Sequence, residues 1–563
     1  MGHAPLPPVP ARDMDVDMLV VGSGTGMFAA LAAADAGLSV VLVEKTAFVG
    51  GSTALSGGAF WIPGNSVLRE AGSHDTTESA RVYLDALVGD AAPRERYQAY
   101  VEHGPAAVDL LRSRVGNRFI WGRGYADYHP EYPGGSAAGR SVESGPFDAR
   151  VLGEERRRLI PPTLVAPVPM PITSGDYRAM NLMGSSPVRA LPKTVARAVQ
   201  GIGGLALRRE YVATGQALGA GLYRAVLDAG IPVWTCTDVD ELLAEDGRVV
   251  GAVLSQEGRR VTVRARRGVV LATGGFDHNA TLRSQVQSDA LDPAWPLGAT
   301  GNTGDALTLG RAVGADVAGM DQAWWFPAIA PVGGASPSVM LAERSLPGSF
   351  LIDQHGQRFI NESIDYMSFG QEVLRRERDG DPVGRMWIVF DQRYRDSYVF
   401  GATAFPRAPL PKAWYEAGIA HRADSPAALA AEIGVDVETF TATMSRFDEM
   451  AARGRDEDFH RGESAYDRYY GDPAHGPNPN LRPLSKAPWY AVEVVLSDLG
   501  TCGGLRADEH ARVLREDGSP IDGLYAIGNA AANAFGNRYP GAGATIGQGL
   551  VFGYLAAQHA ARS

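Results

Sequence analysis

The stretch "DMLVVGSGTG" at residues 17–26 joins a run of apolar residues to a turn rich in glycine. A short apolar run that ends at such a turn is typical of a strand buried on both faces. The next residues, "MFAALAAADAG" (27–37), are small and apolar and end at Gly37, a residue type that often follows the last turn of a helix. "SVVLVEK" (39–45) has the pattern of a second buried strand. This order predicts a βαβ unit in a parallel sheet, and therefore an α/β fold.

The turn itself has the composition of a dinucleotide-binding loop. Gly22, Gly24 and Gly26 would let the backbone approach a pyrophosphate at the start of the helix. The spacing departs from the GxGxxG pattern because Met27 holds the sixth position and Gly26 comes one place early. We therefore expect the helix–strand packing to accommodate Met27. Glu44 ends the second strand, where an acidic side chain accepts hydrogen bonds from the ribose hydroxyls of an unphosphorylated adenosine. The alternative is that Glu44 is a solvated charge at a strand end.

The same strand-then-glycine pattern returns far along the chain, in "GVVLATGGF" (268–276) and "GLYAIGNA" (523–530). The region between, residues 320–488, lacks this pattern and is rich in Trp, Tyr and charged helices. We expect one discontinuous nucleotide-binding domain, residues 1–319 and 489–563, interrupted by a second domain.

Residues 150–215 are rich in Pro and Arg and include "PPTLVAPVPMP" (161–171). We interpret this segment as a long ordered excursion or lid, because long loops in compact folds are often functional.

Composition sets limits on function. The 563 residues include 53 Lys and Arg against 64 Asp and Glu, a formal net charge of −11. This balance argues against nucleic acid and anionic membrane surfaces as partners. Cys236 and Cys502 are far apart, so no CxxC metal or redox motif and no disulfide framework is expected. The start of the chain lacks the order of a signal peptide, and no apolar run is long enough to span a membrane. We expect a cytoplasmic protein without a metal site.

A second glycine cluster, "GGSTALSGGAFWIPGN" (50–65), follows Glu44. NAD does not need such a cluster, whereas it suits the extended diphosphate of FAD. "ATGG" (272–275) and "YAIGN" (525–529) would supply further backbone to the same cofactor. The order of these four motifs resembles the FAD-binding family that includes fumarate reductases and ketosteroid dehydrogenases, and the resemblance covers nearly the whole chain.

Within that family, the chain is most similar to the 3-ketosteroid 1-dehydrogenases. The motifs that carry the resemblance are "GYADYHPEYPGG" (124–135), "MDQAWW" (320–325), "RFINESIDY" (358–366), "SDLGTCGGL" (497–505) and "NRYPGAGATIG" (537–547). The resemblance implies a Rossmann-like FAD-binding domain of the glutathione-reductase type, discontinuous, with an inserted α+β catalytic domain. It also implies noncovalent FAD, 1,2-desaturation of ring A of a 3-oxosteroid, a place in steroid degradation and an unidentified electron acceptor, either quinone-like or an artificial dye. The residues expected to contact FAD are Gly22, Ser23, Gly24, Thr25, Gly26, Glu44, Lys45, Gly51, Ser52, Thr53, Ser56, Gly57, Gly58, Val239, Thr273, Gly274, Gly275, Gly528, Asn529, Ala544, Thr545 and Ile546.

The resemblance assigns the base and its helper to two tyrosines. In such enzymes a tyrosinate removes a proton next to the ketone, and a hydride leaves the neighbouring carbon for flavin N5. Tyr366, at the start of a predicted helix, matches the basic tyrosine, and Tyr128 matches a helper that relays the proton. A free phenol has a pKa near ~10, so the base needs such assistance at neutral pH. Tyr125 and Tyr132 are close enough in sequence to compete for the helper role.

Removal of this proton builds negative charge on the ketone oxygen, and hydrogen-bond donors are needed to stabilise that charge. By resemblance, Tyr539 and the amide of Gly543 are these donors, in a glycine-rich turn that Pro540 constrains. The N-terminus of the helix that follows, "ATIGQGLVFGYLAA", is expected to point at the pyrimidine end of the flavin, where its dipole favours negative charge. A structural tyrosine in a tight turn is the bland alternative.

Three other functions stay open at this point. A fumarate reductase-like protein would carry an arginine in place of Tyr366 and a histidine in the "SDLGTCGG" segment, and neither is present. Desaturation at the 4,5 position would need its base at another ring edge. A non-catalytic flavoprotein would not need paired phenols.

Other conspicuous residues have ordinary explanations as well. The aromatic residues Phe60, Trp324, Trp325 and Phe326 suggest an apolar pocket or, equally, a domain-interface core. We interpret His129 and His355 as structural or solvated and Cys502 as a packing residue.

Overall fold

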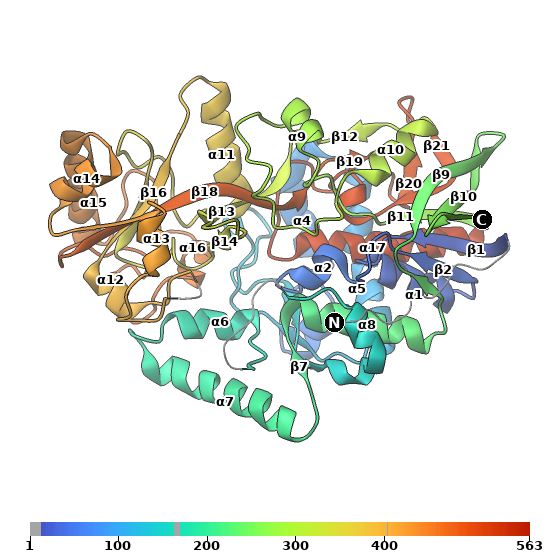
Figure 1. Ribbon diagram of the computed structural model, residues 1–563, viewed down its shortest axis with the longest axis horizontal. Coiled ribbons are helices and arrows are strands. Elements are labelled where there is room, and N and C mark those ends of the chain that lie inside the picture. Colours follow the sequence, from blue (N-terminus) through green and yellow to red (C-terminus); the bar gives the residue numbers. More distant parts are fainter. Residues whose placement is uncertain (1–12, 163–168, 402–403) are drawn as a thin grey trace.

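Two sheets, one in each half of the molecule, organise the fold (Figure 1). The structure is a computed structural model that describes residues 13–162, 169–401 and 404–563. The N-terminal segment, where the sequence shows no signal-peptide order, and residues 163–168 of the Pro-rich stretch lie mostly or wholly outside the described residues.

The first sheet is parallel in its centre. Its main strands in spatial order are β20 (Arg512–Leu514), β21 (Pro520–Ala526), β11 (Arg259–Leu271), β1 (Met14–Val21), β2 (Val40–Val43) and β8 (Val233–Trp234). β1 runs parallel to both β11 and β2, as the βαβ pattern predicts. A hairpin of β9 (Asp238–Glu245) and β10 (Arg248–Gln256) extends from β11. Strands from both ends of the chain therefore form one sheet.

Small residues bring two helices close together against this sheet. α1 (Gly26–Asp35) and α17 (Ala544–Arg562) are both largely buried and pack on each other. A Cβ atom on Gly553 of α17 would lie 3.1 Å from the Cβ of Ala29. The two helices run side by side in the same direction, so both N-termini lie near the glycine turn that follows β1.

The second sheet is antiparallel. It consists of β14 (Ser338–Val339), β13 (Ala323–Ile329), β18 (Trp489–Thr501), β16 (Met386–Asp391) and β15 (Ser349–Ile352), with β17 (Ala420–Ala423) paired to β18. Helices α14 (Pro426–Ile433) and α15 (Val437–Arg453) share a separate hydrophobic core with it. Sequence reasoning placed residue 489 at the return to the nucleotide-binding domain. β18, which starts there, pairs with β13 and β16, and the chain rejoins the first sheet only at β20.

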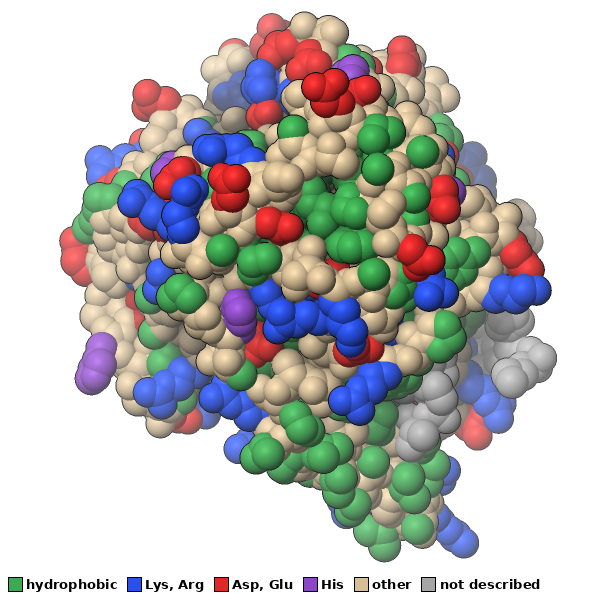
Figure 2. Space-filling model, turned by 90° about the vertical axis from the view of Figure 1, so that its left-hand side faces the viewer, with side chains coloured by type: hydrophobic (Ala, Val, Ile, Leu, Met, Phe, Trp, Pro, Cys, Tyr) green, Lys and Arg blue, Asp and Glu red, His purple; other side chains and the backbone are tan. Residues whose placement is uncertain are grey.

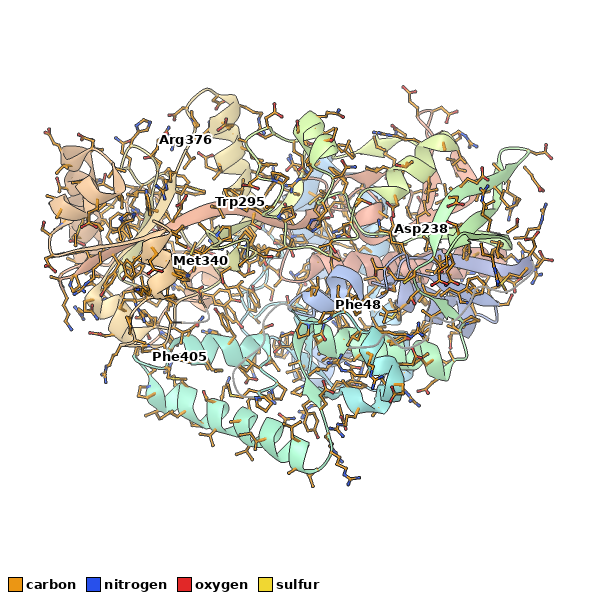
Figure 3. All side chains as sticks on the ribbon, in the orientation of Figure 1. Phe48, Asp238, Trp295, Met340, Arg376 and Phe405 are labelled. Atoms are coloured by element: carbon orange, nitrogen blue, oxygen red, sulfur yellow. The ribbon has the colours of Figure 1, made fainter. Side chains whose placement is uncertain are left out.

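Side chains fill the space between the two halves (Figure 3). Asp238 lies in the half of the first sheet and Met340 in that of the second. A small third sheet consists of β3 (Ala59–Trp61), β5 (Ser141–Ser144) and β4 (Phe119–Trp121), and β3 contacts α17. The helices that surround these sheets and bear on the site are α2 (Gly51–Leu55), α4 (Thr77–Val88), α5 (Arg94–Arg114), α8 (Thr214–Asp228), α11 (Tyr366–Arg378) and α12 (Gln392–Ser397).

The excursion at 150–215 is largely helical. A short 3₁₀ segment (Ala149–Arg158) leads to α6 (Ser174–Asn181) and the longer α7 (Pro187–Ala206), which projects from the lower side of the molecule in Figure 1. None of the helices in the described residues is long and apolar enough to cross a lipid bilayer.

Candidate active site

Tyr366 is the first residue of α11 and is buried. The side chain of Asp365 caps this helix by accepting from the amide of Ser368 at 3.0 Å. The preceding segment is fixed by Glu362, which accepts from Arg358 at 2.8 Å and pairs with Arg461 at 3.2 Å, all three side chains being buried. These buried contacts fix the "RFINES" segment and so position the Tyr366 phenol.

Other phenols surround that of Tyr366. Its hydroxyl lies 3.1 Å from the hydroxyl of Tyr125, within hydrogen-bond distance. The ring of Tyr128 lies 5.5 Å from that of Tyr366 and 4.9 Å from that of Tyr539. Tyr132, the third tyrosine of this motif, is largely exposed and is not part of the cluster. The structure thus brings two candidate helpers, Tyr125 and Tyr128, to the proposed base.

Electrostatics around Tyr366 act in opposite directions. Burial raises its pKa above that of a free phenol, and the hydrogen bond with Tyr125 and the charge of Arg344 oppose that rise without cancelling it. The guanidinium carbon of Arg344 lies 5.4 Å from the centre of the Tyr366 ring. Arg344 is itself buried and donates to the carbonyl oxygens of Glu362 and, at 2.6 Å, Ile364. Sequence reasoning did not find Arg344, since nothing in its local pattern marks it.

Tyr539 is also buried, and its pKa is raised like that of Tyr366. Its pKa is raised well above that of a free phenol, chiefly by burial, so it keeps its proton at neutral pH. Its oxygen accepts from the hydroxyl of Thr545 at 3.2 Å, which leaves its own O–H free to donate elsewhere. The ring centres of Tyr366 and Tyr539 are 6.5 Å apart. One cluster therefore holds a phenol with anion-favouring neighbours next to one that stays a donor.

Gly543 begins α17 in the left-handed region, with φ of 93°. A Cβ atom there would lie 2.4 Å from the carbonyl oxygen of Ala59, so only glycine fits. No side chain caps this helix, and its first amides are therefore available to an acceptor outside the helix.

Alternate residues of β13 line the tyrosine cluster. The Phe326 ring is 4.5 Å from that of Tyr366, and the Trp324 ring is 4.6 Å from that of Tyr539. Trp325 points to the other face of the strand, where Arg283 lies 5.9 Å from its ring. Phe60 packs on Phe119 at 5.5 Å. The predicted aromatic stripe is thus divided between the cluster and the core around it.

The four glycine motifs converge on one place. A Cβ atom on Gly22, whose φ is 102°, would lie 2.3 Å from the carbonyl oxygen of Ala272. Gly51 lies against Gly24, and Gly528 lies near the hydroxyl of Thr25. These close approaches bring the glycine motifs together at the turn before α1, the place where a dinucleotide binds in such folds.

Gly26 makes the close helix–strand contact of the first motif. Gly26, rather than the residue at the sixth position, sits against the strand, since a Cβ there would lie 3.1 Å from Val20 Cγ1. Met27 is fully buried in the same hydrophobic cluster as Val20. Gly26 therefore provides the close helix–strand contact that the last glycine of the GxGxxG pattern usually provides.

Glu44 is held by the protein. One carboxylate oxygen accepts from the amide and hydroxyl of Ser23 at 3.1 and 2.6 Å, and the other accepts from the amide and hydroxyl of Thr46, both at 2.9 Å. The acid thereby ties the end of β2 to the glycine turn.

The remaining residues predicted to contact FAD lie around this convergence. Ser52 accepts from the amide of Ala299 at 2.9 Å, and Asn529 accepts from the indole N–H of Trp324 at 3.0 Å. Lys45 pairs with Asp305 at 2.8 Å. The others lie on the same segments, with Thr53, Ser56, Gly57 and Gly58 in or after α2, Val239 on β9, Gly274 and Gly275 after β11, and Ala544, Thr545 and Ile546 in the first turn of α17.

An unsatisfied polar atom marks the same place. The hydroxyl of Thr273, in the turn after β11, is buried without a hydrogen-bond partner in the part of the chain that the structure describes. A buried hydroxyl costs free energy unless it is paired. Together with the glycine approaches and the uncapped amides of α1 and α17, it fits a bound dinucleotide.

Two buried carboxylates near this turn went unnoticed in the sequence. Asp498 pairs with Arg283 at 2.8 Å, and Asp277 accepts from Asn302 at 3.2 Å. Burial, with the charge of Asp498, raises the pKa of Asp277 to about 8. A carboxyl side chain that keeps its proton at neutral pH is not visible from sequence spacing.

Several conspicuous residues lie outside the cluster. His129 Nε2 is 3.5 Å from Asp365 Oδ2, and His355 lies in the turn after β15. Cys236 and Cys502 are both free thiols. Among the described residues, no group of three or more His, Cys, Asp or Glu side chains could hold a metal ion.

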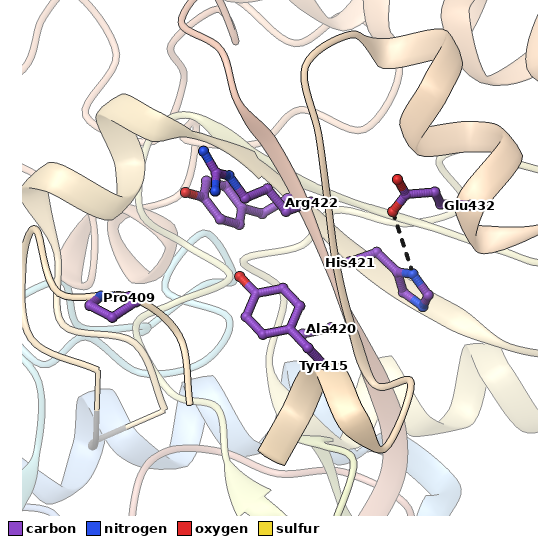
Figure 4. Close-up of a pocket in the computed structure, with 7 residues that line it drawn as sticks. Pro409, Tyr415, Ala420, His421, Arg422 and Glu432 are labelled. Atoms are coloured by element: carbon purple, nitrogen blue, oxygen red, sulfur yellow. Dashed lines mark ion pairs between the residues drawn. The ribbon is translucent and has the colours of Figure 1, made fainter. Parts of the chain in front are cut away.

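An open pocket of about 460 Å³ lies elsewhere, in the second half of the molecule (Figure 4). Tyr415, His421, Arg422 and Glu432 are among its lining residues, and His421 Nδ1 is 3.8 Å from Glu432 Oε2. It shares no residue with the tyrosine cluster, and we assign the chemistry to the cluster.

Comparison with known proteins agrees with this geometry. Residues 17–546 match the FAD binding domain family. A 3-oxosteroid 1-dehydrogenase of Mycolicibacterium smegmatis is 42% identical over 554 residues, which cover 96% of each chain. The chain belongs to the 3-oxosteroid 1-dehydrogenase family. As a member of that family it is an FAD-dependent oxidoreductase, and the predicted fold class and cofactor are confirmed.

Two further relatives bear on what 3-oxosteroid 1-dehydrogenase family members act on. The crystal structure of a 3-ketosteroid Δ1-dehydrogenase from Sterolibacterium denitrificans, in complex with 1,4-androstadiene-3,17-dione, has a TM-score of 0.91 and 36% identity, and the match covers 97% of this chain and 99% of that one. A 4-oxocyclohexanecarboxylate 2-dehydrogenase of Sinomonas cyclohexanicum is 36% identical over 96% of this chain and 92% of its own.

Proposed function

We propose that this enzyme introduces a double bond between C1 and C2 in ring A of 3-oxosteroids, as a step of steroid degradation. The observation that carries the proposal is the pairing of Tyr366 and Tyr539 in one buried cluster. Burial raises the pKa of both phenols, but Tyr125 and Arg344 oppose that rise at Tyr366, whereas Tyr539 keeps its proton and stays a donor. Removal of a proton beside a ketone needs both functions at once.

Tyr366 takes the proton from C2. The hydrogen bond to Tyr125 and the buried charge of Arg344 stabilise the phenolate that acts as base. After the transfer, the proton moves from Tyr366 into the phenol network through Tyr125 or Tyr128. Because the cluster is buried, the surrounding tyrosines rather than bulk water make this transfer possible.

Tyr539 and the Gly543 amide donate hydrogen bonds to the C3 oxygen as negative charge develops there. The Thr545 hydroxyl, by donating to Tyr539, directs the Tyr539 proton toward the substrate. Donors fixed in place before the reaction stabilise the transition state more than the bound ketone.

The glycine motifs would hold FAD noncovalently, and the bound flavin would supply the acceptor for the hydride that leaves C1. Glu44 and Ser23 fix the loop that would hold its adenosine end, where the Glu44 carboxylate would accept hydrogen bonds from the ribose hydroxyls. The α17 N-terminus favours negative charge beside it.

Apolar surroundings favour a steroid over a small keto acid. Trp324 and Phe326 line the cluster, and Nη1 of the buried Arg344 donates to two backbone carbonyls. A carboxylated cyclohexanone, which the name of the Sinomonas relative indicates, would need a cation to pair with its acid group.

The test is anaerobic addition of androst-4-ene-3,17-dione to the purified yellow holoenzyme. We expect rapid bleaching of the flavin absorbance and a product that has lost two hydrogens, identified as the 1,4-diene by NMR. Bleaching by 5α-saturated ketosteroids with a product unsaturated at the 4,5 position would assign the alternative desaturation. Bleaching by 4-oxocyclohexanecarboxylate alone would assign the small ketone, and no bleaching by any of them would leave a non-catalytic flavoprotein.

The arrangement also supports a division of labour between the halves. We propose that residues 1–319 together with the C-terminal segment bind FAD and that the inserted region from residue 320 binds the steroid. We further propose a cytoplasmic location and a quinone-like electron acceptor.

A further inference from the structure

The Gly543 amide, one of the two proposed oxyanion donors, belongs to the peptide unit that joins Ala542 to Gly543. Such a unit is planar, and in its trans form the C=O and N–H bonds point in opposite directions. A contact that fixes the Ala542 carbonyl therefore also fixes the direction of the Gly543 N–H. The residue that holds this carbonyl determines where the donor points.

The hydroxyl of Ser141 holds this carbonyl, donating to the Ala542 oxygen at 2.7 Å. Ser141 is buried at the start of β5, and its backbone lies opposite Trp61 of β3 in the small third sheet. β3 also lies against the donor itself, since a Cβ on Gly543 would be 2.4 Å from the Ala59 carbonyl oxygen. Two neighbouring strands of one sheet therefore contact the two ends of this peptide unit.

The turn that precedes this unit is fixed as well. The Pro540 carbonyl oxygen accepts from the buried Tyr83 hydroxyl at 2.8 Å and from the Tyr128 amide at 3.1 Å. Gly541 lies against the indole of Trp61, where a Cβ would be 2.4 Å from Cδ1. Pro540 thus keeps one donor if the other is lost, whereas Ser141 is the donor that the described residues supply to the next carbonyl but one.

The amide held in this way lies beside the other proposed donor. Burial raises the pKa of Tyr539, and a hydrogen bond from the Gly543 amide is among the contacts that oppose this rise. Two donors directed at one point are what a developing oxyanion needs. A hydrogen bond to the carbonyl of a peptide unit also polarises its N–H, which strengthens that donor.

We propose that Ser141 is a positioning residue of the desaturation and directs the Gly543 amide toward the ketone oxygen of the substrate. The inference rests on the proposed function, because it requires an oxyanion at that amide. Ser141 acts through the Ala542 carbonyl and needs no contact with the steroid or the flavin. Loss of its hydroxyl leaves the donor present but allows its peptide unit to rotate.

The experiment compares Ser141→Ala with Ser144→Ala in the holoenzyme. Ser144 is the matched control, because it is a buried serine on the same strand whose hydroxyl accepts from Asn117 at 2.6 Å. Ser141→Ala should slow flavin reduction by saturating androst-4-ene-3,17-dione roughly tenfold, less than the about 10²–10³-fold that loss of a whole oxyanion donor causes. The dissociation constant of this ketosteroid should change by less than about threefold, because the donor acts chiefly on charge in the transition state. Ser144→Ala should match the wild type in both.

Binding of a steroid with a phenolic ring A, such as estrone, gives a readout without turnover. Its C3 oxygen, bound as the phenolate, imitates the oxyanion, and the perturbed flavin absorbance reports its binding. Ser141→Ala should weaken this binding roughly tenfold and Ser144→Ala should not, because the analogue carries the charge that the donor serves. Tyr83→Phe should slow flavin reduction less than Ser141→Ala does, since the Pro540 carbonyl keeps the Tyr128 amide.

Both alanine variants should keep the wild-type flavin spectrum and melting temperature. Reduction by Ser141→Ala at the wild-type rate, or a loss that Ser144→Ala shares, would overturn the proposal. So would a loss confined to the affinity for the ketosteroid, with binding of the phenolic steroid unchanged. Failure of the proposed function is a different result, because the wild type itself would then form no 1,4-diene.

Discussion

The hydroxyl of Tyr125 lies 3.1 Å from the hydroxyl of Tyr366. The sequence resemblance assigned the helper role to Tyr128, whose ring lies 5.5 Å from that of Tyr366. Two phenols in contact share a proton more easily than one phenol in an apolar site, and the direct contact makes Tyr125 the first candidate for the relay.

Tyr125→Phe is therefore expected to slow turnover by roughly two- to tenfold, the value of one hydrogen bond. Loss of the bond also removes one of the contacts that lower the Tyr366 pKa, so the rise of the rate with pH should move to higher pH. Tyr128→Phe is the comparison. A larger alkaline displacement in Tyr128→Phe than in Tyr125→Phe would return the helper role to Tyr128.

Tyr366→Phe should nearly abolish turnover, by about 10²–10⁴-fold, since loss of a general base has this effect. Flavin absorbance and steroid affinity should be retained, because the segment before Tyr366 is fixed by Arg358 and Glu362 rather than by the phenol. Stopped-flow reduction at saturating steroid measures the loss. A rate close to that of the wild type would place the base elsewhere.

Tyr539→Phe should lower the rate of flavin reduction by about 10²–10³-fold, as loss of one oxyanion donor does. The Gly543 amide remains, so activity should not vanish. Turnover should fall more than affinity, because the donor acts on charge that develops in the transition state. A loss confined to steroid affinity would leave Tyr539 as a wall of the pocket.

Arg344→Met should move the pH dependence of turnover toward alkaline pH. The cation lowers the Tyr366 pKa, so its removal raises that pKa and leaves less phenolate at neutral pH. Arg344→Lys keeps the charge and should lie between Arg344→Met and the wild type. Rates of wild type and Arg344→Met that differ by the same factor at every pH would indicate a packing role instead.

Asp277 should make the protein less stable as pH rises. Its pKa is raised to about 8 in the folded state, whereas an aspartate in the unfolded chain ionises near pH ~4. Between these values the folded chain binds the extra proton, so the free energy of unfolding falls with increasing pH. Asp277→Asn should flatten this dependence, measured as the melting temperature of the holoenzyme across the window. An unchanged slope would mean that Asp277 is ionised when folded.

The sequence predicted the local parts of this molecule well, for physical reasons. The βαβ unit and its glycine turn depend on residues close together in the chain, and the structure contains them as β1, α1 and β2. Tyr366 was expected at the start of a helix and is the first residue of α11.

Long-range placement could not be obtained in the same way. Arg344 and Tyr366 are 22 positions apart and meet only because the second sheet folds them together. β18 looks like any buried strand, so its pairing with β13 and β16 was invisible. The net charge of −11 likewise does not show how charges are arranged in space, since Lys and Arg side chains lie among Asp and Glu side chains on the face in Figure 2.

The position of β18 determines how the two halves of this enzyme respond to proteolysis and heat. One end of the strand lies in the second sheet beside β16, while at its other end the Thr501 hydroxyl accepts from the amide of Phe276, next to the glycine turn after β11. Separating the two halves would require β18, which is one continuous strand, to lose its contacts at one end. Proteolysis should therefore release no stable fragment that holds only the cofactor or only the substrate, and both halves should melt in one transition that FAD shifts as a whole.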